Sequence, residues 1–160
     1  MRGKYRAPLS SFDTLFDIPL LLFVTAVSVM VSLVSKWLSD SFLSERIAIV
    51  GSFAGLEPTQ NSGIAFGIVL PGSLQDVTIV LALVLVAALA LRTAKVPLEQ
   101  IGFGLIVGGA LGNIFDRIRD GFVTDFFQVG TFPVFNVADS CITIGVILLL
   151  AEMMRKKRNM

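Results

Sequence analysis

The chain has 160 residues, of which 54% are hydrophobic and 16% charged. Its mean hydropathy of +0.82 is too high for an ordinary soluble domain and indicates an integral membrane protein. The net charge of +1 comes without a basic patch, so no nucleic acid partner is expected. With no histidine and a single cysteine, the chain lacks the residues of a zinc site, a Ser-His-Asp triad or a Cys-His pair. No metal or other cofactor is expected, and any hydrolytic chemistry has to use carboxylates.

Four apolar runs of about the length that crosses a bilayer divide the chain. They predict transmembrane helices at residues 18–38, 74–91, 98–116 and 138–154. Four such helices leave too few residues for a separate soluble domain, so a single integral-membrane domain over residues 1–160 is predicted. Residues 39–72 would form a cap outside the membrane, and residues 117–136 a loop. In the cap, alternating apolar residues in Arg46–Phe53 and Ile64–Leu70 predict strands or a shallow interfacial layer.

Two helix faces carry small residues that favour close packing. The first run has hydroxyl side chains every three or four residues, which places them on one helix face directed into the bundle. The third run has glycines every four residues, where another helix or a substrate can approach closely. The residues are Thr25, Ser28, Ser32 and Ser35 in the first run, and Gly104, Gly108 and Gly112 in the third.

The end of the first run carries Lys36 and Trp37. We interpret this pair as an interfacial anchor, in which the lysine extends toward the headgroups and the indole lies at the boundary.

Basic residues indicate how the four runs are oriented. One side of a four-span arrangement collects most of them, and by the positive-inside rule that side is cytoplasmic. Both termini are then cytoplasmic, and the cap and the loop lie at the outer face. The cytoplasmic set is Arg2, Lys4, Arg6, Arg92, Lys95, Arg155, Lys156, Lys157 and Arg158, against Lys36, Arg46, Arg117 and Arg119 on the other side.

Four acids, Asp116, Asp120, Asp125 and Asp139, gather at the outer ends of the last two runs. Ionisable residues at the edge of a membrane are costly and indicate function. The aromatic and β-branched residues around Gly130 predict a hairpin, which can bring Asp125 opposite Asp139. Two carboxylates in that position share a proton, as in aspartic proteases, where one acid activates water and the other polarises the scissile carbonyl.

An asparagine lies three residues before an aspartate at two places, Asn113 before Asp116 and Asn136 before Asp139. On a helix this spacing lets the amide orient the acid.

Other roles for these acids remain open. Asp120 is interpreted as a turn residue beside Gly121, and Asp116 as a structural partner of Arg117. Asp139 can also be explained as an acid at a helix N-terminus. From the residues alone, a catalytic pair and a proton or ion path are equally open.

Four ordered blocks resemble lipoprotein signal peptidase, also called signal peptidase II. They are NSGIAFG (61–67), GGALGNIFDR (108–117), VTDFF (123–127) and FNVADS (135–140), with SKW at the end of the first run. The resemblance implies a bacterial inner-membrane aspartyl endopeptidase with four transmembrane helices and a small extramembrane β-cradle. Its substrates would be diacylglyceryl-modified prolipoproteins, cut on the N-terminal side of the lipidated cysteine.

The resemblance also implies site residues and partners. Asp125 and Asp139 correspond to the family's catalytic acids. Beyond the prolipoprotein signal peptide, the partners implied are membrane lipids and the family's cyclic-peptide inhibitors, and a monomer is expected. The supporting or substrate-contacting positions are Ser32, Lys36, Asn61, Gly63, Phe66, Asn113, Asp116, Arg117 and Asn136.

One departure from the family concerns Ser32, because members usually carry an aspartate four residues before the lysine of the first span. Either Ser32 replaces that acid as a hydrogen-bond donor, or another acid such as Glu57 replaces it, or activity is reduced. The alternatives to an active peptidase are an inactive relative that binds prolipoproteins and a small proton- or ion-coupled transporter. A transporter is expected to hold its carboxylates near the bilayer midplane.

Overall fold

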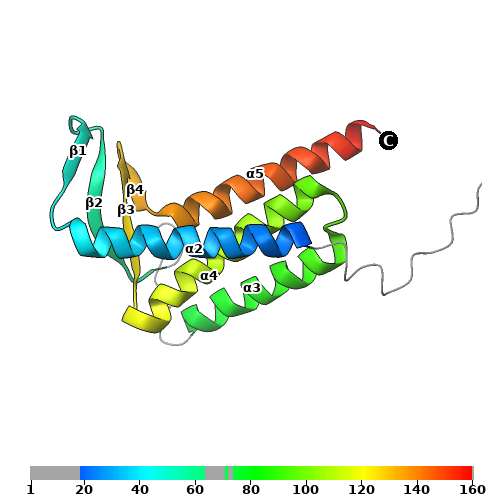
Figure 1. Cartoon of the computed structure of the whole chain (residues 1–160), viewed down its shortest axis with the longest axis horizontal. Helices are drawn as coiled ribbons and strands as arrows, with labels where there is room; N and C mark the ends of the chain where they lie inside the picture. The colour runs from blue at the N-terminus through cyan, green and yellow to red at the C-terminus, as the bar shows by residue number, and fades with distance from the viewer. Residues whose placement is uncertain (1–18, 64–70, 72–73, 160) are drawn as a thin grey trace, which may run out of the picture.

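A computed structural model describes residues 19–63, 71 and 74–159 as four helices and a four-stranded antiparallel sheet. Each helix is long and apolar enough to cross a membrane. The sheet, in the order β1-β2-β3-β4, lies across one end of the helices (Figure 1). The predicted fold class is thereby confirmed. The elements are α2 (Pro19–Phe42), β1 (Ile47–Val50), β2 (Ala54–Asn61), α3 (Leu74–Thr93), α4 (Pro97–Asp120), β3 (Val123–Val129), β4 (Phe132–Phe135) and α5 (Val137–Arg158).

The elements differ from the predicted bounds in two ways. Helices α2, α4 and α5 continue about one turn past the predicted ends at residues 38, 116 and 154, so Arg117 and Asp120 are helical. The prediction missed strand β2, which contains Pro58 and has an irregular register between Leu56 and Thr59. Proline has no backbone N–H to donate to a neighbouring strand, so Pro58 argues against a strand when only the sequence is considered. The predicted strand at Ile64–Leu70 lies outside the described residues.

Helix α4 lies between α2 and α5 and touches both through glycines. A Cβ atom added to Gly108 would lie 2.5 Å from the Cβ of Ser28, and one added to Gly112 would lie 2.8 Å from the Cβ of Ser32. On the α5 side, a Cβ on Gly109 would lie 2.4 Å from the carbonyl oxygen of Ala138. The glycine face of the third span is therefore occupied by α2, which favours helix packing over a substrate groove.

Helix α3 is the least embedded of the four. Within it, only Gln75 near the sheet and Ala90 near the far end are buried. Ala90 belongs to a small apolar cluster with Leu21 and Phe103, at the end of the bundle away from the sheet. Most of the other large apolar side chains of α3 are exposed, as expected for a helix surrounded by lipid, whereas Val86 packs against the cluster.

Candidate active site

Asp125 lies on β3, opposite Thr59 of β2, and its side chain is 1% exposed. Both carboxylate oxygens accept hydrogen bonds from asparagine amides. Oδ1 accepts from Nδ2 of Asn136 at 2.6 Å, and Oδ2 accepts from Nδ2 of Asn61 at 2.9 Å. The strand fixes the backbone of this acid, while two other elements, β2 and the start of α5, fix its carboxylate.

Asp139 lies in the first turn of α5, which Asn136 caps. Oδ1 of Asn136 accepts from the backbone N–H of Asp139 at 3.0 Å, and Oδ2 of Asp139 accepts from the backbone N–H of Asn136 at 3.1 Å. This reciprocal pair is a capping box, and it holds the acid at the helix N-terminus. The amide of Asn136 therefore contacts the backbone of Asp139, and not its carboxylate as the three-residue spacing had suggested.

Asn113 of α4 connects the two acids to a cation. Its Oδ1 accepts from Nζ of Lys36 at 2.7 Å and from Nδ2 of Asn136 at 3.1 Å. Because a lysine ammonium can only donate, the amide oxygen must face Lys36, and Nδ2 of Asn113 then donates to Oδ1 of Asp139 at 2.8 Å. Asn113 therefore orients Asp139, and not the neighbouring Asp116 that its spacing suggested.

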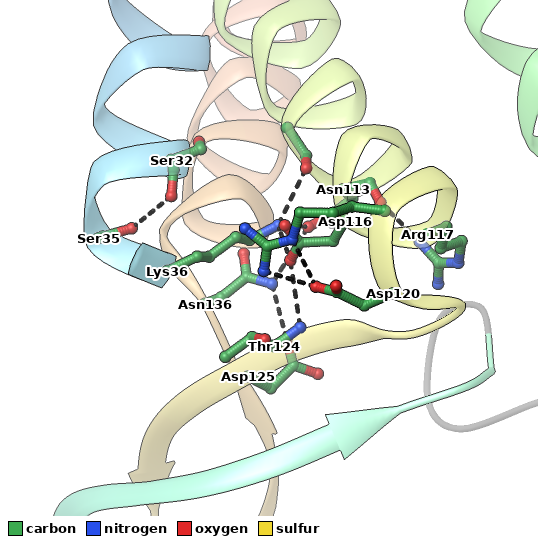
Figure 2. A network of polar contacts seen from close by, with 12 residues as sticks. Ser32, Ser35, Lys36, Asn113, Asp116, Arg117, Asp120, Thr124, Asp125 and Asn136 are labelled. Atoms are coloured by element: carbon green, nitrogen blue, oxygen red, sulfur yellow. Dashed lines mark hydrogen bonds and ion pairs between the residues drawn. The ribbon is translucent and has the colours of Figure 1, made fainter. Parts of the chain in front are cut away.

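Lys36 and Asp116 form an ion pair inside the bundle, with 3.0 Å between Nζ and Oδ2 and with both side chains 1% exposed. Lys36 also donates to the carbonyl oxygen of Gly112 at 3.1 Å, and Oδ2 of Asp116 accepts from the backbone N–H of Thr124 at 3.2 Å. Figure 2 shows Lys36 reaching from α2 to the side chains of α4. Two predictions were wrong: Lys36 does not extend toward the headgroups, and Asp116 does not pair with Arg117.

Arg117 points in another direction, because successive residues on a helix are about 100° apart. Its guanidinium donates to the carbonyl oxygen of Gly63 and, at 3.5 Å, to that of Asn113. It therefore connects α4 to the segment that follows β2. Phe66, which the resemblance assigns to the site, lies outside the described residues.

Ser32 does not replace the missing family aspartate through a hydrogen bond. The residue is fully buried, and its Oγ atom has no hydrogen-bond partner among the described residues. Its Cβ packs against Gly112 instead. The carboxylate paired with Lys36 is that of Asp116, and Glu57 is not among the partners of this lysine.

Asp40 is a site residue that the sequence analysis missed. Its Oδ1 accepts from Oγ1 of Thr124 at 3.0 Å, and its Oδ2 accepts from Arg119 at 3.0 Å. Thr124 directly precedes Asp125, so Asp40 and Asp116 hold the strand beside the acid from two helices. The available signal was spacing, because Asp40 lies one helical turn after Lys36 and shares its face.

Asp120 is the last residue of α4 and precedes Gly121, whose φ of 82° ends the helix. Its carboxylate accepts from Nε of Arg119 at 2.7 Å. It is exposed and does not bond to Asp125 or Asp139, but it belongs to the last turn of α4, and the turn predicted for it begins at Gly121.

Asp125 and Asp139 line the same cavity, which has a volume of about 680 Å³ and mostly apolar walls. Helices α3, α4 and α5 form its sides, and β4 closes it at the sheet. Such a cavity accepts an extended apolar segment and places it beside a few polar groups. Its other lining residues are Asn61, Ile79, Ala110, Asn113, Arg117, Val123, Phe132, Pro133, Val134, Phe135, Ser140, Ile142, Thr143 and Ile144.

The surroundings of Asp125 favour its protonated form. Burial, more than any other cause, raises the pKa of Asp125 to about 6, and the charge of Asp139 acts in the same direction. The hydrogen bonds from Asn61 and Asn136 and the charge of Lys36 oppose this rise. A carboxyl group that titrates near neutral pH suits proton transfer.

Comparisons with known proteins find relatives by sequence and by fold. A family model described as signal peptidase (SPase) II matches residues 24–155. The lipoprotein signal peptidase of Syntrophomonas wolfei is 41% identical over 140 residues, covering 82% of this chain and 93% of that protein. That of Moorella thermoacetica is 39% identical over 114 residues, covering 69% and 75%. A solved structure of a bacterial membrane enzyme superposes with a TM-score of 0.78 and 28% sequence identity, covering 89% of this chain and 92% of its own.

Proposed function

The chain belongs to the signal peptidase II family of membrane peptidases, and we propose that it cleaves prolipoproteins with a water molecule activated by Asp125 and Asp139. The observation that carries this proposal is that both acids line one apolar cavity and are bound to the same asparagine, Asn136. Membership of the family supports the cleavage of prolipoprotein signal peptides. The residues that perform the cleavage are inferred from the geometry of the cavity.

In the proposed reaction Asp125 carries a proton and Asp139 is ionised, in line with the raised pKa of Asp125. Asp139 takes a proton from water as the water oxygen bonds to the carbonyl carbon, and Asp125 donates its proton to the carbonyl oxygen. The tetrahedral intermediate then breaks its C–N bond. One hydroxyl proton returns to Asp125, and Asp139 gives its proton to the leaving nitrogen, so both acids regain their starting states.

The position of the acids supports cleavage at the edge of the bilayer. Asp139 lies in the first turn of α5, and β3 carries Asp125 directly beyond the end of α4. A signal peptide that spans the membrane would place its lipidated cysteine at this level, with the diacylglyceryl chains remaining in the lipid. The cut would then fall on the N-terminal side of that cysteine. The same placement disfavours a transporter, whose carboxylates are expected near the midplane.

The orientation follows from charge. Arg92 and Lys95 lie at the turn between α3 and α4, and the last turn of α5 carries four basic residues. All lie at the end of the bundle away from the sheet (Figure 1). We therefore propose that this end is cytoplasmic in a bacterial inner membrane and that the sheet lies at the outer face. We propose further that the peptidase works as a monomer in contact with lipid, and that the family's cyclic-peptide inhibitors occupy the same cavity.

The test uses the full chain in lipid nanodiscs with a diacylglyceryl-modified prolipoprotein and the same precursor without the lipid. Mass spectrometry should find cleavage only in the lipidated precursor, directly before its modified cysteine. Asp125→Asn should abolish this cleavage and Asp120→Asn, the matched control at an exposed acid, should retain it. Cleavage at another bond, or a wild-type chain that binds the precursor without cutting it, would refute the proposal.

A further inference from the structure

Gln75 is a buried polar residue with no part in the reaction described above. It lies in the first turn of α3, is 9% exposed, and donates from Nε2 to the carbonyl oxygen of Ser62 at 2.6 Å. We propose that Gln75 is a positioning residue for the peptidase reaction, because it holds the Asn61–Gly63 segment and thereby keeps the Asn61 amide on Asp125. This inference rests on the function proposed for Asp125.

The segment needs holding because the sheet ends there. Asn61 is the last residue of β2 to pair with β3, so strand pairing does not fix Ser62 and Gly63. The backbone N–H of Gly63 donates to Oδ1 of Asn61 at 2.9 Å. This bond turns the amide so that its Nδ2 faces Asp125. A shift of Ser62 or Gly63 would therefore change which atom of the amide Asp125 meets.

Two side chains from two helices hold this segment. Arg117 of α4 donates to the carbonyl oxygen of Gly63, and Gln75 of α3 donates to that of Ser62. Gln75 is also the one residue that α3 buries at the end near the sheet. Ile79, one turn further along α3, lines the cavity. The Gln75 hydrogen bond thus connects α3, which lines the cavity, through the Asn61–Gly63 segment to Asp125.

Gln75 could position Asn61, or it could only attach α3 to the segment after β2. The two roles differ in their effect on Asp125. The charged groups that face this acid are Asp139 from α5, Lys36 from α2 and Arg117 from α4. The hydrogen bond from Gln75 to Ser62 involves none of these three groups. The hydrogen bond from Asn61 would be lost, and such a bond favours the ionised carboxylate. Removing Gln75 should therefore raise the pKa of Asp125.

The experiment uses Gln75→Met, a neutral side chain of similar length, in the full chain in nanodiscs. Two titrations are recorded: the pH profile of kcat/KM with the lipidated precursor, and the ¹³C NMR signal of the Asp125 carboxyl group. Both midpoints should rise by about one pH unit. Asn61→Ala should give the same shift, and the double variant should shift no further. Thr78→Val is the matched control, because Oγ1 of Thr78 donates to the carbonyl oxygen of Leu74 in its own helix.

Wild-type midpoints in Gln75→Met, or shifts that add in the double variant, would overturn the inference. Gln75→Asn, whose shorter amide does not reach Ser62, replaces Gln75→Met if that variant does not fold. The NMR titration needs no turnover, so it decides the positioning role even if the chain does not cleave the precursor. A shifted NMR titration without cleavage would refute the proposed function and leave the positioning role of Gln75 intact.

Discussion

Two buried carboxylates lie toward opposite ends of the helix bundle, and they differ in their partners. Asp116 and Glu152 are each 1% exposed, and each forms an ion pair. The partner of Asp116 is Lys36, which is also 1% exposed and donates to Asn113, whose amide in turn donates to Asp139. The partner of Glu152 is Arg155, which is 58% exposed. Burial of an acid is therefore a weaker sign of function than the residues to which its partner is bound.

The difference also has an energetic side. Breaking an ion pair of two buried groups leaves one charge without compensation in a low-dielectric interior. A carboxylate with an exposed partner can instead recruit water or another cation, so its pair contributes less. The predictions below test this contrast, starting with the largest effect.

Lys36→Met should destabilise the folded chain by about 3–5 kcal/mol, because the buried carboxylate of Asp116 loses its partner. Cleavage should also be lost, since Oδ1 of Asn113 then has no ammonium to face and its amide can rotate away from Asp139. Unfolding in detergent micelles measures the first effect and the peptidase assay the second.

A double variant, Lys36→Met with Asp116→Leu, sharpens the same test. Replacing both members of a buried pair with apolar groups can restore stability, but it cannot restore the donor to Asn113. Recovery of stability without recovery of cleavage is expected. Full cleavage in this variant would show that the pair is only structural.

The contribution of Asp125 to stability should fall as the pH rises from about 4 to above 6. Asp125 has its pKa raised from 3.8 to about 6 in the folded chain, so the folded state binds this proton more tightly than the unfolded state does. The loss is on the order of 2–3 kcal/mol. Asp125→Asn removes the titrating group and should flatten this part of the stability profile. An unchanged slope in the variant would contradict the burial argument.

Asp40→Ala should cost about 1–2 kcal/mol and lower cleavage several-fold, because Thr124 loses the acceptor of its hydroxyl group beside Asp125. Thr124→Val removes the other side of the same hydrogen bond and is the matched variant. If the bond is what matters, the double variant should be no worse than the poorer single one. Additive losses would mean that Asp40 acts through Arg119 instead.

Arg155→Gln should change stability by at most about 1 kcal/mol and leave cleavage unchanged, because Arg155 is largely exposed and lies far from the cavity. This variant is the counterpart of Lys36→Met at the other end of the bundle. A loss of stability as large as that expected for Lys36→Met would contradict the contrast drawn between the two ion pairs.

Much of the fold could be predicted from sequence because apolar length and charge placement are local signals. The four spans follow from hydropathy, and the hairpin after α4 from its aromatic and β-branched residues around Gly130. The capping of α5 follows from three-residue spacing within one helix, Asn136 to Asp139. Strand β2 was missed because Pro58 and its polar neighbours interrupt the alternation.

The contacts between elements could not be predicted in the same way. Lys36 and Asp116 are 80 residues apart, and adjacency in sequence wrongly favoured Arg117 as the partner of Asp116. One local signal pointed to the right answer, because Lys36 continues the four-residue spacing of Ser28 and Ser32 and so shares their buried face. The interpretation as an interfacial lysine gave too little weight to that spacing.

The most direct test of the central claim is single-turnover cleavage of a lipidated prolipoprotein by Asp125→Asn, Asp139→Asn and the double variant, with folding checked for each. Two acids that act on one water molecule should fail as a unit. Each single variant should lose at least about a thousandfold in rate, and the double variant should lose little more. A single variant that keeps more than about a tenth of the wild-type rate would contradict the proposed acid pair.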